Sequence, residues 1–148
     1  MPDPNAERKH WMSVLARASA AEIAALLEQA PALPEPVVLR PPECGLAMVR
    51  GRAGGGGAAF NLGEMTVTRC SVRAGAQVGH AYRAGRDRQA ALLSARIDAA
   101  LQDPATHNAL RAAVIDRLAE RQEAARRETA ARAAATRVEF FTMRSMRT

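Results

Sequence analysis

The sequence is poor in aromatic residues, with one Trp, one Tyr and three Phe among its 148 residues. Hydrophobic residues make up 48% of the chain, but much of that share is Ala. A chain of this length can bury a modest core within one domain. Leu, Val, Ile and Met must therefore build that core, and we expect part of it to lie at an interface.

Cysteine is also scarce, and no apolar run is long. Cys44 and Cys70 are the two cysteines, too few for a disulfide scaffold. No stretch approaches the roughly 20 apolar residues of a membrane-spanning helix, and the N-terminal residues do not resemble a signal peptide. We therefore expect a reduced, cytoplasmic protein with no membrane partner.

Groups that carry catalysis or bind metals are few and scattered. The three histidines, His10, His80 and His107, lie in different segments and lack the spacing of a metal site. Glu64 stands nearly alone in the region of predicted strands, so a pair of carboxylates for acid–base chemistry is missing. The sequence thus predicts no catalytic residue and no metal site.

The charge of the chain allows two interpretations. A net charge of +6 and a pI of about 10.8 are typical of nucleic-acid binding. However, Arg and Glu alternate near the C-terminus at the spacing of ion pairs on a solvated helix, as in Glu123/Arg127 and Glu128/Arg132. Aromatic residues for base stacking are scarce. A small basic nucleic-acid-binding protein therefore stays as the alternative function.

The first 31 residues predict a helical hairpin. Apolar periodicity indicates a helix over 5–17, with Trp11 on its apolar face. Ser19 and Glu22 form a capping box that starts a second helix, which runs to about Ala30 before a Pro-rich stretch ends it.

The middle of the chain predicts strands. Short strands are expected at 37–39, 46–50 and 58–62, and Pro41-Pro42 is expected to break the chain between the first two. The four glycines at 54–57 lack the following helix or Lys of a phosphate-binding loop. We interpret them as a flexible hairpin tip, with phosphate binding as the open alternative.

The clearest hairpin joins 65–73 to 78–83 through a turn at Gly75-Ala76. Its register sets Arg69 opposite Tyr82, Ser71 opposite His80, and Cys70 opposite Ala81. One face is small and uncharged and is expected to lie under helices: Thr66, Thr68, Cys70, Val72, Gly79 and Ala81. The other face suits a partner or an anionic ligand: Met65, Val67, Arg69, Ser71, Arg73, Val78, His80 and Tyr82. Cys70 and His80 then lie on opposite faces, which argues against a nucleophilic pair.

Two further helices follow the hairpin. Asp87 is the expected N-cap of a third helix that ends near Gln102, and Asp103-Pro104 starts a last helix. Its apolar stripe continues to Leu118, but between 119 and 136 no apolar residue is larger than Ala.

Five arginines surround the hairpin and the start of the third helix: Arg69, Arg73, Arg83, Arg86 and Arg88. The N-terminus of a helix favours anions, and guanidinium groups bind phosphate. Arg69, Arg73, Arg86 and Arg88 are therefore candidate anion contacts. The alternative is that Arg86 and Arg88 pair with carboxylates or solvent.

Together these elements predict an α+β fold, with a small antiparallel sheet covered by helices on one face. We expect a single domain over 1–148. Its parts are the helical hairpin at 1–31, antiparallel strands at 36–84, packed helices at 85–118, and an extended helix with a docking arm at 119–148.

Near the end of the sequence lies an apolar block, Val138-Glu139-Phe140-Phe141-Thr142-Met143, after a segment without an apolar stripe of ordinary width. Aromatic side chains stabilise a protein when they are buried, so exposed ones favour burial against a partner. We interpret the block as an arm that docks on a partner subunit; a frayed tail that folds back locally is the alternative. The candidate interface residues are Trp11, Tyr82, Phe140, Phe141 and Met143.

Several blocks, taken together in this order, resemble the PhnG family, a subunit of the bacterial carbon–phosphorus lyase system. They are the run Arg8–Ala16, Val67-Thr68-Arg69, Gly85–Gln89, Ile97-Asp98-Ala99 and the terminal run Thr136–Met143. The similarity spans nearly the whole chain, while the Gly-rich loop and Pro-rich linker add little to it.

The resemblance implies a role in phosphonate metabolism within a complex, the alpha-D-ribose 1-methylphosphonate 5-triphosphate synthase. Members of the family act with the H, I and L subunits to attach a phosphonate to the ribose C1′ of ATP, which releases adenine. The J subunit, a radical iron–sulfur protein, later breaks the carbon–phosphorus bond, and the G, H, I and J subunits form a core with two copies of each.

By the same resemblance, ATP and a phosphonate are substrates of the complex, and this chain alone binds no cofactor. We expect it to scaffold or complete the active site of the I subunit, with Arg side chains at most assisting. A free-standing enzyme, by contrast, would turn over ATP and methylphosphonate alone, and a nucleic-acid-binding protein would bind DNA with a steep salt dependence.

Overall fold

A computed structural model describes residues 5–138 of the protein. The chain divides into two compact units, residues 1–118 and 119–148, and each is described by itself. The division falls where the sequence separates the packed helices from the extended segment.

The first unit begins with the predicted helical hairpin. Helix α1 spans Ala6–Arg17 and helix α2 spans Ala20–Leu27. The capping box is present: the Ser19 hydroxyl accepts from the Glu22 amide, and the Ser19 amide donates to the Glu22 carboxylate at 2.8 Å. Helix α2 ends earlier than expected, because the chain leaves it through a turn at residues 28–29.

Three antiparallel strands, β1 (Val37–Gly51), β2 (Phe60–Ala74) and β3 (Gln77–Ala84), form one sheet in the order β1-β2-β3. Gly75, in the turn between β2 and β3, has a φ of 60°, which suits glycine. The register of β2 and β3 pairs Arg69 with Tyr82 and Cys70 with Ala81, and so confirms the predicted hairpin.

The predicted break at Pro41-Pro42 is wrong. Strand β1 runs through both prolines, and its register shifts between Val38 and Arg40 and again between Arg40 and Glu43. Proline is tolerated on an edge strand and at bulges, because the missing N–H removes no ladder bond there. The strand expected at 58–62 starts at Phe60 as the beginning of β2.

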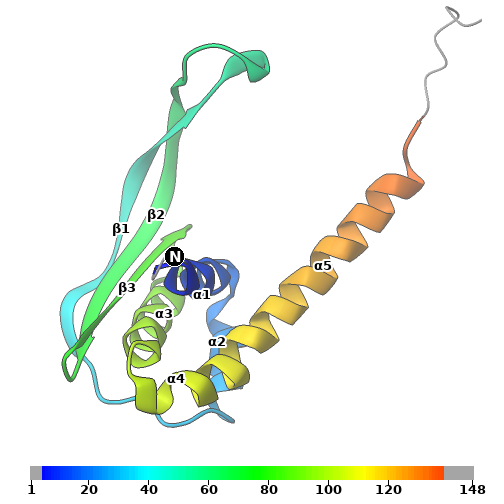
Figure 1. The fold of residues 1–148 in the computed structure, drawn as a ribbon. Helices are drawn as coiled ribbons and strands as arrows, with labels where there is room; N and C mark the ends of the chain where they lie inside the picture. The colour runs from blue at the N-terminus through cyan, green and yellow to red at the C-terminus, as the bar shows by residue number, and fades with distance from the viewer. Residues whose placement is uncertain (1–4, 139–148) are drawn as a thin grey trace, which may run out of the picture. The chain divides into compact units, whose positions relative to one another are not determined.

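The hairpin of β1 and β2 is much longer than β3 (Figure 1). Strand β3 pairs with β2 only from Val67 to Ala74. Residues 46–51 of β1 and 60–66 of β2 therefore form a two-stranded extension, called here the ribbon. The glycines lie at its tip, where Ala53–Gly55 make a short 3₁₀ turn (η1).

Helix α3 (Arg88–Leu101) covers one face of the sheet, as expected (Figure 1). Asp87 is its N-cap and accepts from the Ala90 amide at 2.8 Å. The contact between helix and sheet is made by small residues: Cys70, Val72, Ala74, Ala81, Ala91, Ala95 and Ala99. Helices α1 and α2 also contact α3, so α3 forms the centre of the α+β fold.

The last helical segment contains a π-helical turn. Helix α4 (Pro104–Leu110) continues through a π-helix, η2 (Arg111–Ile115), into α5 (Asp116–Ala135). The apolar stripe is buried as predicted at Leu110, Val114 and Leu118.

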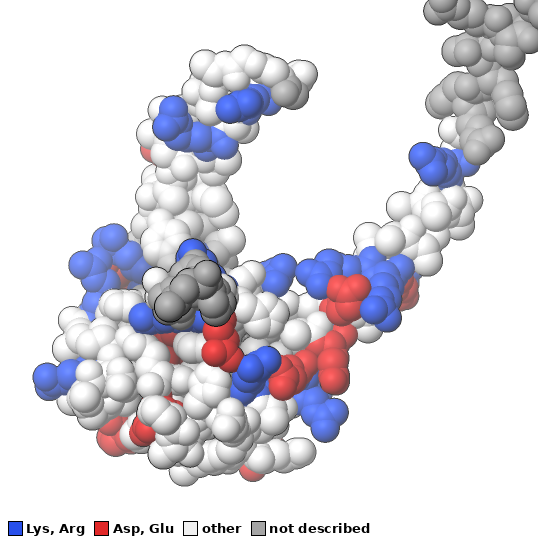
Figure 2. Space-filling model, in the orientation of Figure 1, with Lys and Arg blue, Asp and Glu red and all other residues white. Residues whose placement is uncertain are grey.

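The second unit contains the remainder of α5, from residue 119, whose side chains are mostly exposed. The predicted ion pairs are present: Glu123 binds Arg127 with an Oε1–Nε distance of 3.1 Å, and Glu128 binds Arg132. Basic and acidic side chains alternate along this helix (Figure 2). In residues 5–138, the search for a helix of sufficient length and apolarity to cross a bilayer found none.

Candidate functional site

A buried carboxylate joins two of the blocks that carry the family resemblance. Asp98 is fully buried in α3. Its Oδ1 accepts from Arg8 Nε at 3.1 Å and Trp11 Nε1 at 2.9 Å. Its Oδ2 accepts from Arg8 Nη2 and from the backbone amide of His80, each at 2.8 Å. These four residues, the Asp98 cluster, tie α1 and β3 to α3 and so hold the fold together.

A second set of bonds fixes the chain before α3. The Thr68 hydroxyl donates to the Gly85 carbonyl at 2.7 Å, and the Gly85 amide donates to the Thr66 carbonyl at 2.9 Å. These bonds hold the turn that leads into α3 against β2. They therefore position Arg86 and Arg88, which follow Gly85.

Arg86 and Arg88 line a pocket of about 340 Å³ between this turn and the sheet. We call it the Arg86–Arg88 pocket. Its lining residues are Cys44, Gly45, Leu46, Thr66, Arg86 and Arg88. Within residues 5–138 neither guanidinium forms an ion pair with a carboxylate. The pocket thus has a positive character.

The thiol of Cys44 responds to this environment. Its pKa lies below the ordinary value because of a hydrogen bond with the Thr68 hydroxyl, the hydrogen bond and positive charge of Arg88, and the charge of Arg86. The Thr68 hydroxyl donates its proton to the Gly85 carbonyl at 2.7 Å. Arg88 is therefore the donor that stays available to a Cys44 thiolate, and Arg86 adds its positive charge. Burial instead raises the pKa of Cys70.

The sequence did not indicate Cys44 as a pocket residue. The predicted break at Pro41-Pro42 left Cys44 outside the expected strands, whereas the continuous β1 pairs it with Thr68. Only the register of β1 against β2, together with the position of the α3 N-terminus, brings Cys44 beside the arginines.

The other candidate anion contacts lie elsewhere. Arg69 is on the outer face of the sheet, where its Nε donates to Glu43 Oε1 at 2.7 Å. Arg40 donates to the same oxygen at 2.9 Å, and the hydrogen bond from Arg69 is the main cause of the lowered pKa of Glu43. Arg73 is exposed, seven residues beyond Thr66 along β2. The structure therefore brings together only Arg86 and Arg88 of the four.

Arg83, grouped with these arginines in the sequence, is a core residue. Only 8% of it is exposed, and its Nη2 donates to the Ala18 carbonyl at 2.7 Å. Burial lowers its pKa, and the charge of Asp87 opposes that effect. Because Arg83 faces the helices, it is not available to a ligand on the sheet surface.

His80 and Cys70 lie on opposite faces, as the register predicts. Cys70 is buried, while the exposed His80 places Nδ1 2.9 Å from the Ser71 hydroxyl. Within residues 5–138 no group of three or more His, Cys, Asp or Glu side chains could hold a metal ion.

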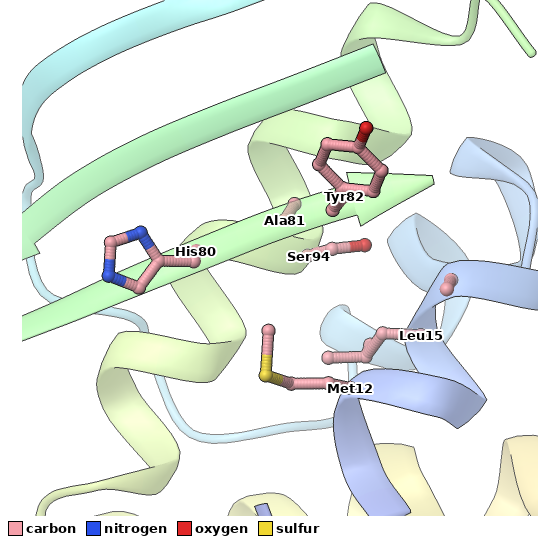
Figure 3. Close-up of a pocket in the computed structure, with 7 residues that line it drawn as sticks. Met12, Leu15, His80, Ala81, Tyr82 and Ser94 are labelled. Atoms are coloured by element: carbon pink, nitrogen blue, oxygen red, sulfur yellow. The ribbon is translucent and has the colours of Figure 1, made fainter. Parts of the chain in front are cut away.

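A pocket near His80 is too small for a substrate. Figure 3 shows Met12 and Leu15 of α1 across from Tyr82 of β3, with Ser94 of α3 between the elements. The space is about 30 Å³, roughly the volume of one water molecule.

The candidate interface residues fall into three environments. Trp11 packs into the core of the chain and is only 6% exposed, so it offers little surface to a partner. Tyr82 is 58% exposed on the outer face of the sheet. Phe140, Phe141 and Met143 lie outside the described residues. An interface role for these five residues stays a prediction.

Comparison with known proteins agrees with the resemblance. Residues 6–145 match the family described as phosphonate metabolism protein PhnG. Over 139 residues the chain is 45% identical to the alpha-D-ribose 1-methylphosphonate 5-triphosphate synthase subunit PhnG of Rhizobium meliloti (strain 1021). That match covers 93% of this chain and 88% of the relative. The chain therefore belongs to the PhnG family of phosphonate metabolism proteins.

Proposed function

We propose that this chain is a subunit of an alpha-D-ribose 1-methylphosphonate 5-triphosphate synthase in the carbon–phosphorus lyase complex. The observation that carries the proposal is its 45% identity, over 93% of its length, to a protein named as a subunit of that synthase. The complex would transfer the ribose triphosphate of ATP to a phosphonate and release adenine.

The role of this chain in that reaction is structural. The buried polar groups of the Asp98 cluster are used to join helices to the sheet. Cys70, the buried thiol, faces away from His80. These placements support a subunit that completes the active site of the I subunit rather than one that carries the chemistry itself.

The ribbon supports binding to another subunit. Its large apolar side chains are exposed: Leu46 67%, Met48 58%, Phe60 48%, Leu62 57% and Met65 39%. Figure 2 shows the ribbon as largely uncharged, with basic side chains near its tip. A two-stranded ribbon is only marginally stable in water, and clustered apolar side chains favour protein contact.

We assign the ribbon to contact with the I subunit. Beyond the end of β3, residues 60–65 of β2 have no strand on that side. Such an open edge can pair with a strand of another chain. The H, J and L subunits complete the proposed set of partners, with two copies of each core subunit.

The test is affinity co-purification after co-expression with the I subunit. The wild-type chain should retain the I subunit in a stoichiometric complex through a wash at 1 M salt. The double substitution Leu46→Ser and Leu62→Ser should weaken retention about a hundredfold, because each leucine loses roughly 1.5 kcal/mol of apolar burial at the interface, or about tenfold in affinity.

Val37→Ser is the matched control, since Val37 is 53% exposed on the same strand but lies in the three-stranded part of the sheet. It should leave retention unchanged. Elution of the wild-type chain alone, with DNA binding that falls steeply with salt, would instead support the nucleic-acid alternative.

A further inference from the structure

The Arg86–Arg88 pocket has the charge pattern of an anion site. Its two guanidinium groups flank Asp87, but the Asp87 carboxylate is used elsewhere. Its Oδ1 accepts from the Ala90 amide at 2.8 Å, and its Oδ2 accepts from the Ala20 amide at 3.4 Å. The Asp87 carboxylate therefore caps α3 and does not pair with Arg86 or Arg88.

The other nearby carboxylate is also unpaired with the arginines. Glu64 lies two residues from Thr66 on the same face of β2. No ion pair joins Glu64 to Arg86 or Arg88 in the described part of the chain. Two cations therefore share one pocket, and no carboxylate of residues 5–138 forms an ion pair with them.

The side chains that line the pocket suit a phosphate-type anion. Guanidinium groups bind phosphate-type oxygens through two parallel hydrogen bonds. Thr66, which also lines the pocket, carries a hydroxyl donor. Leu46 supplies an apolar wall. A volume of about 340 Å³ is at the small end of ligand pockets, large enough for one phosphoryl or phosphonyl group with its attached atoms.

We propose that the Arg86–Arg88 pocket binds the phosphonate or phosphate group of a substrate of the complex. This inference rests on the proposed function, in which two substrates carry such a group: methylphosphonate and ATP, through its triphosphate. The lowered pKa of Cys44 is a consistent sign, because the arginines already favour a negative atom within the pocket.

Cys44 provides the assay. The full-length chain is treated with iodoacetamide in the presence of methylphosphonate, of tripolyphosphate, or of NaCl at equal ionic strength. Peptide mass analysis then measures the rate at which each cysteine is modified. The salt arm removes general screening as a cause. Cys70 is buried and reports any loosening of the fold.

We expect a bound anion to slow the modification of Cys44 about tenfold at ten times its Kd, where one site in roughly eleven is empty. Protection by methylphosphonate alone identifies the phosphonate as the ligand, and protection by tripolyphosphate alone identifies the triphosphate. Protection by both identifies a general phosphate-type site. Equal rates in all three arms would overturn the proposal.

Matched variants test the arginines. Arg86→Gln with Arg88→Gln should abolish the protection while leaving the melting temperature of the chain unchanged. Arg73→Gln removes one positive charge about 23 Å along β2 from Thr66 and should keep full protection. Protection that survives in the double variant would contradict the assignment.

Co-purification with the I subunit separates the two proposals. If the wild-type chain retains the I subunit but no anion protects Cys44, the pocket assignment fails and the proposed function stands. If Arg86→Gln with Arg88→Gln also releases the I subunit without any anion protection in wild type, the pocket is part of the subunit contact, and the ligand proposal is wrong.

Discussion

At the scale of single residues, the Asp98 cluster explains why two distant blocks of the family pattern occur together. Arg8 and Trp11 lie near the N-terminus, yet both donate to the one carboxylate of Asp98. A buried carboxylate requires such donors, because an unpaired charge in the interior is costly. The blocks therefore mark a requirement of folding rather than of chemistry.

Asp98→Asn should destabilise the chain by about 3 kcal/mol, since its amide N–H group would face donors and the charge opposite Arg8 would be lost. Urea unfolding of the purified chain measures this. Glu43→Gln is the control, because Glu43 also binds arginine, in its case Arg40 and Arg69, but on an exposed face; it should leave unfolding unchanged. Equal effects of the two substitutions would show that burial of Asp98 does not matter.

Cys44 and Cys70 should differ in reactivity. The hydrogen bond with Thr68, together with Arg88 and Arg86, lowers the pKa of Cys44, while burial raises that of Cys70. The alkylation rate of Cys44 should therefore rise at a lower pH than that of a free thiol, and Arg88→Gln should move this rise to higher pH. A rate profile measured by mass spectrometry checks this prediction. A profile that is unchanged by Arg88→Gln would contradict it.

At the scale of elements, the packing of α3 on β3 depends on one glycine. A Cβ at Gly79 would lie 2.0 Å from the Ala95 carbonyl oxygen and 2.5 Å from the Ala99 amide nitrogen. Both are backbone atoms of α3, so they cannot rotate away. The helix can approach the sheet this closely only because residue 79 has no side chain.

Gly79→Ala should therefore cost about 3 kcal/mol of unfolding free energy, at the upper end of ordinary overpacking. Gly45→Ala is the control: Gly45 is also in a strand, and a Cβ there would meet nothing within 4 Å. Thermal and urea unfolding should separate the two variants clearly. Similar stability of both would refute the close approach of α3.

The sequence predicted those elements whose signals are local. The capping box at Ser19, the N-cap at Asp87 and the β2–β3 register follow from nearby residues, and all three are confirmed. The continuity of β1 was missed, because Pro41-Pro42 signals a break unless the strand is known to be at an edge.

The same limit applies to the site. Arg86 and Arg88 were found because they follow the turn before α3 in the sequence. Cys44 lies beside these arginines only because it pairs with Thr68, 24 residues away. Arg69 lies on the other face of the sheet, because successive side chains of β2 point to opposite faces. Contacts set by distant pairing cannot be derived from local pattern alone.

At the scale of the whole molecule, the chain has segments that partner subunits would complete. The second unit contains a helix without an apolar stripe, and the apolar block that follows it, with Phe140 and Phe141, lies outside the described residues. The ribbon in the first unit exposes five large apolar side chains. Each unit thus contains a segment that a partner subunit could bury.

Phe140→Ala with Phe141→Ala should weaken assembly more than folding, because the sequence before the block offers it no apolar surface. The fraction of the chain that co-purifies with the other subunits, compared with the melting temperature of the free chain, measures this. An unchanged complex together with a lower melting temperature would contradict the docking arm and support a tail that folds back locally.

Reconstitution of the synthase tests whether this chain is a required but non-catalytic subunit. Adenine release from ATP and methylphosphonate is measured with the H, I and L subunits, with and without this chain, and with this chain alone. We expect release only when all four subunits are present. Equal release by the other subunits without this chain, or turnover by this chain alone, would contradict it.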